Sequence, residues 1–529
     1  MRGQKDRKTI QTLLLLCFSL ILSGCGHIGY KPRGFDIPPV KISAENAHPP
    51  GYSPRKIVIF FDGTANDEGS DTNVKRLHSL ITLQDRKDIA SLYILGVGTN
   101  LDPIGLVTGS GINARVMLAY EFILNHYTPK TREMEADEIY IFGFSRGAFA
   151  ARILTTMLNY AGIVNEARDQ TALRKYTPKE LSELVHAATF PGFGSPDDAD
   201  KPEVRPGNLK TKLAAKGLIS AVNSDNSISV PVKVLGLWDT VEALGSPGIV
   251  SNLMIPLLSQ PPKTDVDAPN LRYGEKLCNV EAAYHAVSID DNRATMFTPL
   301  LLSRRHLFDG CTRGKGLLDN YGRIKPDQLQ EVWFSGAHSD VGGGYANGAL
   351  SGVSLNWMLN GIKCTGLLPN AVCPAEVSKS RDTHFVREDF FGGSHDPTAG
   401  IWSFYPNVSR DLVTYALDKR SISRAEGKPQ EPTPLCVHKS VFERRSVIGY
   451  QKEHEYNQLS LTKLPSSGQV TVQLSLGDYG KQRSWKWLRE HKSSNGSPDK
   501  NSMYIQRYPA CWFSEAATIN HLDPLGEQK

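Results

Sequence analysis

Short apolar stretches alternate with amphipathic segments from residue 56 onward, and this alternation limits the fold more than any other feature of the chain. Three of the apolar stretches are KIVIFF, ASLYIL and EIYIFGF, and segments of helical length and period separate them. Near-continuous apolar strands are typical of a parallel sheet covered on both faces, with helices as the crossover connections. The pattern predicts an α/β fold with a doubly wound, mostly parallel sheet.

The N-terminal residues carry the features of a bacterial lipoprotein signal. MRGQKDRK is basic, TLLLLCFSLIL is apolar, and LSGC follows with small residues before Cys25. The apolar run is too short to span a bilayer, so we expect a signal peptide over residues 1–24 and lipidation of Cys25. An ordinary signal peptide with an incidental cysteine is the alternative. Gly26 favours sorting to the outer membrane, which predicts a lipoprotein of the bacterial cell envelope held to the membrane through Cys25.

The rest of the chain divides by composition. Residues 25–54 are rich in Pro and Gly with no apolar period, which predicts a tether. The α/β domain is expected over residues 55–445. Between about residues 163 and 229 polar and Pro-rich sequence replaces the alternation, and we expect an insertion that caps the sheet. Residues 446–529 mix strand-like runs with charge and are expected to form a C-terminal accessory region.

Net charge bears on whether the protein binds nucleic acid, and the number of cysteines bears on whether it can form disulfides. The formal net charge is +5, and removal of residues 1–24 leaves +2, because that segment has four basic residues and one acidic residue. So small an excess gives no support to a nucleic-acid partner. Six cysteines remain after Cys17 and Cys25, and an even number permits disulfides in an oxidising compartment. Cys364 with Cys373 is the pair we would test first, and six buried free thiols is the alternative.

A Gly-x-Ser-x-Gly pentapeptide, GFSRG, lies where a predicted strand passes directly into a predicted helix. Such a bend forces its central residue into a strained conformation, and Gly143 and Gly147 relieve the crowding on either side. The Ser145 hydroxyl then lies above the sheet edge, and the N–H of Arg146 points toward a developing oxyanion. In this setting the pentapeptide predicts that Ser145 is a nucleophile.

A nucleophilic serine needs a general base and a group that orients it, and later strand ends offer both. Asp239 follows the apolar stretch VKVLGLW, and His338 follows VWFSGA in a glycine-rich loop. We expect Asp239 to be the acid and His338 the base. The alternatives are a helix N-cap for Asp239 and a structural role for His338. Asp340 is a second candidate for the orienting group, or a brace for the loop.

The end of the first predicted strand supplies the remaining candidates. FFDGT places the amides of Gly63 and Thr64 where an α/β-hydrolase has its second oxyanion donor. Asp62 is expected to hold this loop in shape by hydrogen bonds.

Five motifs together resemble one family. In chain order they are FFDGTANDEG, GFSRGAFAAR, GLWDTVEALGSPG, YHAVSIDDNR and WFSGAHSDVGGGY, and they resemble the bacterial DUF2235 domain, which includes the Tle1-like phospholipase effectors of type VI secretion. The resemblance covers residues 55 to 345 and extends more faintly to 445. It implies an α/β-hydrolase with serine esterase chemistry on phospholipid acyl esters. It also implies a supporting role for His285, which is the alternative base.

We therefore expect a serine hydrolase that cleaves carboxylic esters, with lipid acyl esters as substrates, through an acyl-enzyme on Ser145 and without a metal or organic cofactor. The lipoprotein signal separates the chain from the injected effectors, which are loaded in the cytoplasm. One alternative is a non-catalytic envelope lipoprotein that keeps a hydrolase fold. The enzymatic alternative is a metal-dependent hydrolase with the ligands Asp62, Asp239, His338 and Asp340.

Overall fold

The structure is a computed structural model. It describes residues 41–43, 54–63, 71–82, 86–96, 111–130, 135–166, 176–190, 205–220, 230–242, 273–291, 293, 297–325, 327–345, 348, 350–368, 394–397, 410, 415, 418, 420–422, 435–438, 440, 459–462, 473–476 and 505–507. The predicted signal peptide, Cys25, most of the tether, Thr64 and Cys373 lie outside these residues. The chain divides into two compact units, Met1–Pro39 and Val40–Lys529, and the second contains every described residue. Within the described residues, no helix has the length and apolar character needed to cross a membrane.

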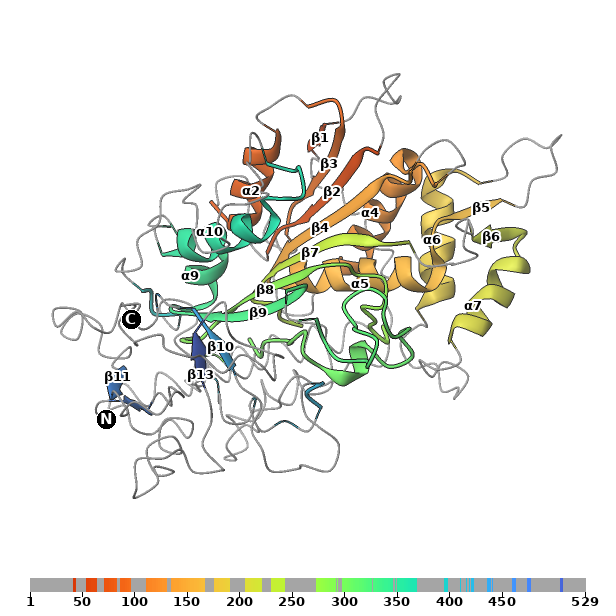
Figure 1. Cartoon of the computed structure of the whole chain (residues 1–529). Coiled ribbons are helices and arrows are strands. Elements are labelled where there is room, and N and C mark those ends of the chain that lie inside the picture. The colour runs from red at the N-terminus through yellow and green to blue at the C-terminus, as the bar shows by residue number, and fades with distance from the viewer. Residues whose placement is uncertain are drawn as a thin grey trace, which may run out of the picture. The chain divides into compact units, whose positions relative to one another are not determined.

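A nine-stranded sheet forms the centre of the second unit (Figure 1). Its first strand pairs antiparallel with its neighbour, and all other neighbouring strands pair parallel. In spatial order the strands are β1 (Lys41–Ser43), β3 (Ile89–Ile94), β2 (Lys56–Phe61), β4 (Glu138–Phe144), β7 (Val232–Trp238), β8 (Ala283–Ser288), β9 (Leu329–Phe334), β10 (Leu435–Val437) and β13 (Ile505–Arg507).

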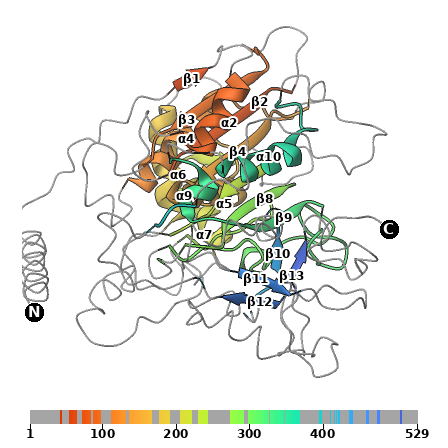
Figure 2. The ribbon, with the colours of Figure 1, turned by 90° about the vertical axis from the view of Figure 1, so that its left-hand side faces the viewer.

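Helices cover both faces of this sheet (Figure 2). One layer contains α2 (Asn73–Thr82), the short α9 (His338–Gly342) and α10 (Ser351–Ile362). The other contains α4 (Ile112–His126), α5 (Arg146–Ala161) and α6 (Pro178–Thr189). The remaining elements are β5 (Val164–Glu166), α7 (Arg205–Ala214), β6 (Leu218–Ser220), the 3₁₀ helix η3 (Arg305–Leu307), β11 (Leu459–Thr462) and β12 (Gln473–Leu476).

Strand β2 illustrates why these strands have continuous apolar sequences. Ile57 and Ile59 pack in one core cluster with residues of α4 and α5, and Val58 and Phe60 pack in the other with residues of α2 and α10. Successive side chains of a strand point to opposite faces, so a strand between two helical layers needs apolar residues at every position. The sequence-based prediction of a doubly wound, mostly parallel α/β fold is confirmed.

The segment predicted as a cap contains β5, α6, α7 and β6. Thr177 and Glu180 form a capping box at the start of α6, and Val185 of this helix belongs to the core cluster that contains α4 and α5. Helix α6 therefore extends a helical layer of the sheet. Strand β13, from the predicted C-terminal accessory region, pairs with β10, and β11 and β12 pair with each other. The exact domain boundaries remain a prediction.

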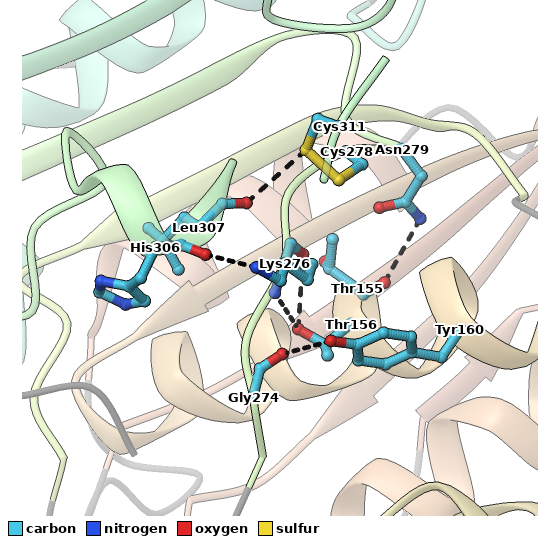
Figure 3. The surroundings of a disulfide bond; sticks show 10 residues. All are labelled: Thr155, Thr156, Tyr160, Gly274, Lys276, Cys278, Asn279, His306, Leu307 and Cys311. Atoms are coloured by element: carbon cyan, nitrogen blue, oxygen red, sulfur yellow. Dashed lines mark hydrogen bonds between the residues drawn. A yellow bond between two sulfur atoms is a disulfide. The ribbon is translucent and has the colours of Figure 1, made fainter. Parts of the chain in front are cut away.

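A disulfide joins Cys278 to Cys311, 33 residues apart (Figure 3). The chain leading into Cys278 lies along α5, because Tyr160 donates a hydrogen bond to Gly274 O at 2.9 Å. Lys276 N donates to Thr156 Oγ1 at 3.1 Å in the same region. The bridge thus lies beside the C-terminal half of the helix that begins after Ser145. Cys364 and Cys436 are also disulfide-bonded, and the proposed pairing of Cys364 with Cys373 stays a prediction.

Candidate active site

Ser145 occupies the bend between β4 and α5, with φ 59° and ψ −127°. A side chain at Gly143 would place its Cβ 2.6 Å from Ala148 Cα, and one at Gly147 would place its Cβ 2.4 Å from Asp62 O. Such contacts are too close for any carbon atom, so both positions require glycine. The Ser145 N–H donates to Trp238 O at 3.0 Å, which fixes the bend against the neighbouring strand β7.

Ser145, His338 and Asp239 form one hydrogen-bonded chain at the carboxyl ends of β4, β9 and β7. The distance from Ser145 Oγ to His338 Nε2 is 2.7 Å, and that from His338 Nδ1 to Asp239 Oδ2 is 2.5 Å. An ionised carboxylate only accepts hydrogen bonds, so Nδ1 carries the ring proton and Nε2 accepts the serine hydroxyl. The carboxyl ends of parallel strands share one edge, and three distant sequence motifs therefore meet here.

The imidazole of His338 lies between two aromatic rings. Its centroid is 4.7 Å from that of Phe144 and 4.9 Å from that of Phe297. The backbone N–H of His338 donates to Asp291 Oδ2 at 3.1 Å. Burial lowers the pKa of His338, and the charge and hydrogen bond of Asp239 only partly oppose this. The ring is therefore held as a neutral imidazole, which is the form that can accept a proton.

Asp239 is fully buried and accepts four hydrogen bonds. One comes from His338, one from the Ser288 N–H at 2.9 Å, and two from the Arg410 guanidinium at 2.6 and 2.8 Å. Burial alone would raise the pKa of this carboxyl, but Arg410 and His338 together hold it well below its ordinary value. The residue also has φ 40°. Sequence reasoning missed Arg410, because no motif surrounds it.

The predicted oxyanion donors have different surroundings. Arg146 is the first residue of α5, where helical geometry gives the backbone N–H no acceptor within the helix. Its buried guanidinium has a pKa lowered to about 9 by burial and by the charge of Arg115. The Gly63 N–H donates to Asp62 Oδ1 at 2.6 Å, so in this structure it faces the carboxylate. Thr64 lies outside the described residues.

Asp62 stabilises the loop at the end of β2, because both of its carboxylate oxygens accept hydrogen bonds. Thr72 Oγ1 donates to Oδ2 at 2.7 Å, and the Tyr93 hydroxyl donates to the same oxygen. With the Gly63 amide, these contacts link the loop to α2 and β3. Burial raises the pKa of this carboxyl to about 6 in spite of the three donors.

His285 lies in β8 with both ring nitrogens engaged. Its Nδ1 donates to Glu331 Oε2 at 2.8 Å, and its Nε2 accepts the N–H of Thr240 at 3.1 Å. The backbone donor fixes Nε2 as the acceptor, so the proton is on Nδ1. His285 therefore contacts the residue that follows Asp239, and its nitrogens are not directed to Ser145. Sequence reasoning did not identify Glu331 as its partner.

Asp340 braces the loop around His338. Its Oδ2 accepts the N–H of Ala337 at 2.9 Å, and its Oδ1 contacts His395 Nδ1 at 2.6 Å. The ring of Tyr345 stacks on His395 with centroids 3.8 Å apart. Of the four residues in the metal-ligand alternative, Asp239 and His338 bind each other, whereas Asp62 and Asp340 have other partners. No group of three or more His, Cys, Asp and Glu side chains in the described part of the chain could hold a metal ion.

The sheet order, the two helical layers and the serine at the strand-to-helix bend define an α/β-hydrolase-like protein. The sequence model of one family, described as the catalytic domain of the Tle1-like phospholipase effectors of type VI secretion, matches residues 55–361. The chain belongs to this family.

Individual relatives are distant. A protein of Saccharomyces cerevisiae, described as uncharacterized protein YEL023C, is 23% identical in an alignment 292 residues long that covers 49% of this chain and 36% of the yeast protein. An uncharacterized protein from Pseudomonas aeruginosa is similar in structure at 19% identity and a TM-score of 0.30, over 57% of this chain and 45% of the other. A Tle1 effector bound to the VgrG spike gives 16% identity and a TM-score of 0.23, over 55% and 51%. The chain therefore spans about half or less of the length of these proteins.

Proposed function

We propose that this protein is a serine hydrolase that cleaves carboxylic esters through an acyl-enzyme on Ser145. The observation that carries the proposal is the chain of hydrogen bonds from Ser145 Oγ through His338 to Asp239, at 2.7 and 2.5 Å. A neutral imidazole in contact with a serine hydroxyl, and oriented by a buried carboxylate, is the arrangement that activates a serine for attack on a carbonyl.

The reaction has two halves. His338 Nε2 takes the hydroxyl proton as Ser145 Oγ attacks the ester carbonyl, and it then gives that proton to the departing alcohol. Water next attacks the acyl-enzyme with His338 as the base, which releases the carboxylic acid and restores the serine. Asp239 holds the imidazole in position and stabilises the imidazolium in both halves. The Arg146 N–H at the start of α5 is the proposed oxyanion donor, and the loss of one such donor typically slows a reaction about 10²- to 10³-fold.

Phospholipid acyl esters are the proposed substrates. The support is membership in the family of Tle1-like phospholipase effectors over residues 55–361. The test is a profile of the fatty acids and lysolipids released from vesicles of defined phospholipid composition. Release of a fatty acid from such vesicles by the wild type, and none by Ser145→Ala, is the expected result. Turnover of soluble esters without release from any phospholipid would contradict the lipid substrate and leave the esterase proposal standing.

A fluorophosphonate tests the nucleophile directly. The adduct is expected on the peptide that contains Ser145, and Ser145→Ala is expected to remove both the adduct and ester hydrolysis. Ser182→Ala is the matched control, because Ser182 is a buried serine on α6 that donates to Met117 O. Labelling and turnover should survive that change. Activity that persists in Ser145→Ala and disappears with EDTA would favour the metal-dependent alternative. A folded wild type that neither labels nor hydrolyses esters would favour the non-catalytic alternative.

We also propose that the chain is a lipoprotein of the bacterial cell envelope, anchored in the outer membrane through Cys25. The support is the basic, apolar and LSGC sequence of the first 25 residues. Cys25→Ser is expected to leave an unlipidated precursor that no longer takes up labelled palmitate. Cys17→Ser, in the apolar run of the same segment, is the control and should be lipidated normally. Equal palmitate uptake in wild type and Cys25→Ser would refute the anchor.

A further inference from the structure

The Arg410 guanidinium forms a bidentate ion pair with the carboxylate of Asp239, the proposed catalytic acid. Nη1 donates to Asp239 Oδ1 at 2.6 Å and Nη2 donates to Oδ2 at 2.8 Å. The same two nitrogens donate to Ser288 O at 2.6 Å and Phe297 O at 2.7 Å. Both charged side chains are completely buried. The guanidinium therefore has a fixed position between the ends of β7 and β8.

This arginine lies outside the segment that defines the family, since the family match ends at residue 361. It is 171 residues from Asp239 in the sequence. None of the motifs around Ser145, Asp239 and His338 includes it. A residue from the later part of the chain thus completes the surroundings of the site.

Arg410 offsets the negative charge of Asp239, which would otherwise favour the protonated form of His338. Asp239 contacts the imidazole, and Asp291 accepts the backbone N–H of His338. Asp291 is itself paired with Arg293 at 2.6 Å, and Asp239 with Arg410. The charged groups around the histidine are Asp239, Asp290, Asp291, Arg293, Asp340 and Arg410. Asp340 is paired with His395, and Asp290 Oδ2 accepts the Gly336 N–H.

We propose that Arg410 is a positioning residue that offsets the charge of Asp239, so that His338 remains a neutral base at lower pH than an unbalanced carboxylate would allow. The proposal rests on the proposed serine hydrolase function. Its physical basis is that an opposite charge next to a histidine favours the imidazolium, and a cation bound to that charge weakens the effect. Arginine also fixes a carboxylate in one plane by two parallel hydrogen bonds, which lysine cannot do.

The test measures the rate of fluorophosphonate reaction at Ser145 in the full-length protein as a function of pH. Arg410→Met removes the charge and keeps much of the volume. The pH midpoint of the acidic limb is expected to rise by about one unit. Arg410→Lys keeps the charge and loses the bidentate hydrogen bonding to Asp239. Its midpoint is expected to stay within about 0.3 units of the wild type, with a plateau rate lowered about tenfold.

Arg152→Met is the matched control. Arg152 of α5 is a buried arginine in an ion pair with Glu275 at 2.7 Å, and its guanidinium hydrogen bonds within the described residues go to Glu275 and Leu300 O rather than to the triad. It should lower thermal stability and leave the pH midpoint unchanged. Arg410→Gln, a shorter neutral side chain, replaces Arg410→Met if the methionine variant does not fold.

Two results would overturn the inference. One is a midpoint that is the same in the wild type and in a folded neutral variant. The other is unfolding of all three Arg410 variants at every pH, since that would assign Arg410 a purely structural role. Failure of the wild type to label at Ser145 would instead contradict the proposed function. The two proposals can therefore fail separately.

Discussion

Ser145 and Asp239 both have a positive φ, 59° and 40°, and they are the two non-glycine residues with positive φ in the described part of the chain. Both contact the ring of His338, one at each nitrogen. Residues other than glycine in this region cost of order 1 to 3 kcal/mol each. The fold thus holds two strained turns at the ends of adjacent strands, β4 and β7, on either side of one imidazole.

Ser145→Gly should raise the melting temperature while it removes the proposed nucleophile. Glycine adopts positive φ without strain, whereas alanine keeps the strain that serine has. We expect Ser145→Gly to be about 1 kcal/mol more stable than Ser145→Ala, after the larger conformational entropy of glycine in the unfolded chain is subtracted. Calorimetry of the wild type and both variants measures the order. A glycine variant less stable than the alanine variant would show that the bend is not strained.

His285→Ala should chiefly affect stability, and His338→Ala should chiefly affect activity. Removal of His285 takes one donor from the buried Glu331 carboxylate, which keeps the Leu302 N–H and the Ser303 hydroxyl. It also leaves the buried Thr240 N–H without this acceptor, so a loss of about 1 to 3 kcal/mol is expected. Glu331→Gln in the His285→Ala background should recover part of that loss. His338→Ala should abolish ester turnover with a native circular dichroism spectrum. Denaturant unfolding and turnover of a nitrophenyl ester measure the two effects. Full turnover by folded His338→Ala would reassign the base.

Asp62→Asn should gain stability over the wild type as pH rises. The folded-state pKa of Asp62 is raised to about 6 from an ordinary value of 3.8. Between pH 4 and pH 6 the folded state therefore binds more protons than the unfolded state, and this group lowers stability as pH increases. Asparagine cannot ionise. The difference in unfolding free energy between variant and wild type should move by about 2 kcal/mol in favour of the variant from pH 4 to pH 7.

Asp309→Asn is the control for that series, because Asp309 is exposed. The change for Asp62→Asn over this pH range is expected to exceed the change for Asp309→Asn. A flat difference for Asp62→Asn would show that the Asp62 carboxylate ionises in the folded protein as easily as in the unfolded chain.

Removal of the Cys278–Cys311 bridge should lower stability and spare the triad. The bridge closes a loop of 33 residues, for which chain entropy predicts a contribution of about 3 to 4 kcal/mol. The double variant Cys278→Ala/Cys311→Ala leaves the other disulfides in place, which chemical reduction does not. Its unfolding midpoint in denaturant should fall, while fluorophosphonate labelling of Ser145 at 25 °C is retained. Loss of labelling in a folded double variant would instead tie the bridge to the nucleophile through α5.

The sequence predicted those parts of the fold that depend on neighbouring residues, namely the buried strands and the bend at Ser145. The apolar runs at β2, β3, β4 and β7 indicate strands buried on both faces, and the paired glycines around Ser145 mark the bend. Strand β8 was not predicted, because His285 lies within it and interrupts the apolar pattern. The buried imidazole is satisfied by two tertiary contacts, with Glu331 on the neighbouring strand β9 and with the Thr240 N–H.

Contacts between distant charged residues could not be predicted in the same way. Arg410 has no distinctive neighbours in the sequence, and its role follows only from the tertiary contact with Asp239. Asp340 illustrates the converse. Its position two residues after His338 is compatible with an orienting role, but its carboxylate is turned to Ala337 and His395. Sequence spacing predicts that a residue lies near a site, but tertiary packing determines which atoms its side chain contacts.

The separation of Asp239 from Arg410 also has a consequence for the order of biosynthesis. A ribosome adds 171 residues between the two, which takes roughly 10 to 30 s at typical rates of elongation. Once His338 has been added, later in this interval, the nascent chain contains Ser145, Asp239 and His338, but Asp239 has no cation beside it. We therefore expect the candidate active site to be complete only after Arg410 has been added. Fluorophosphonate labelling of ribosome-stalled chains that end before and after Arg410 leaves the exit tunnel would measure that delay, and equal labelling of both would refute it.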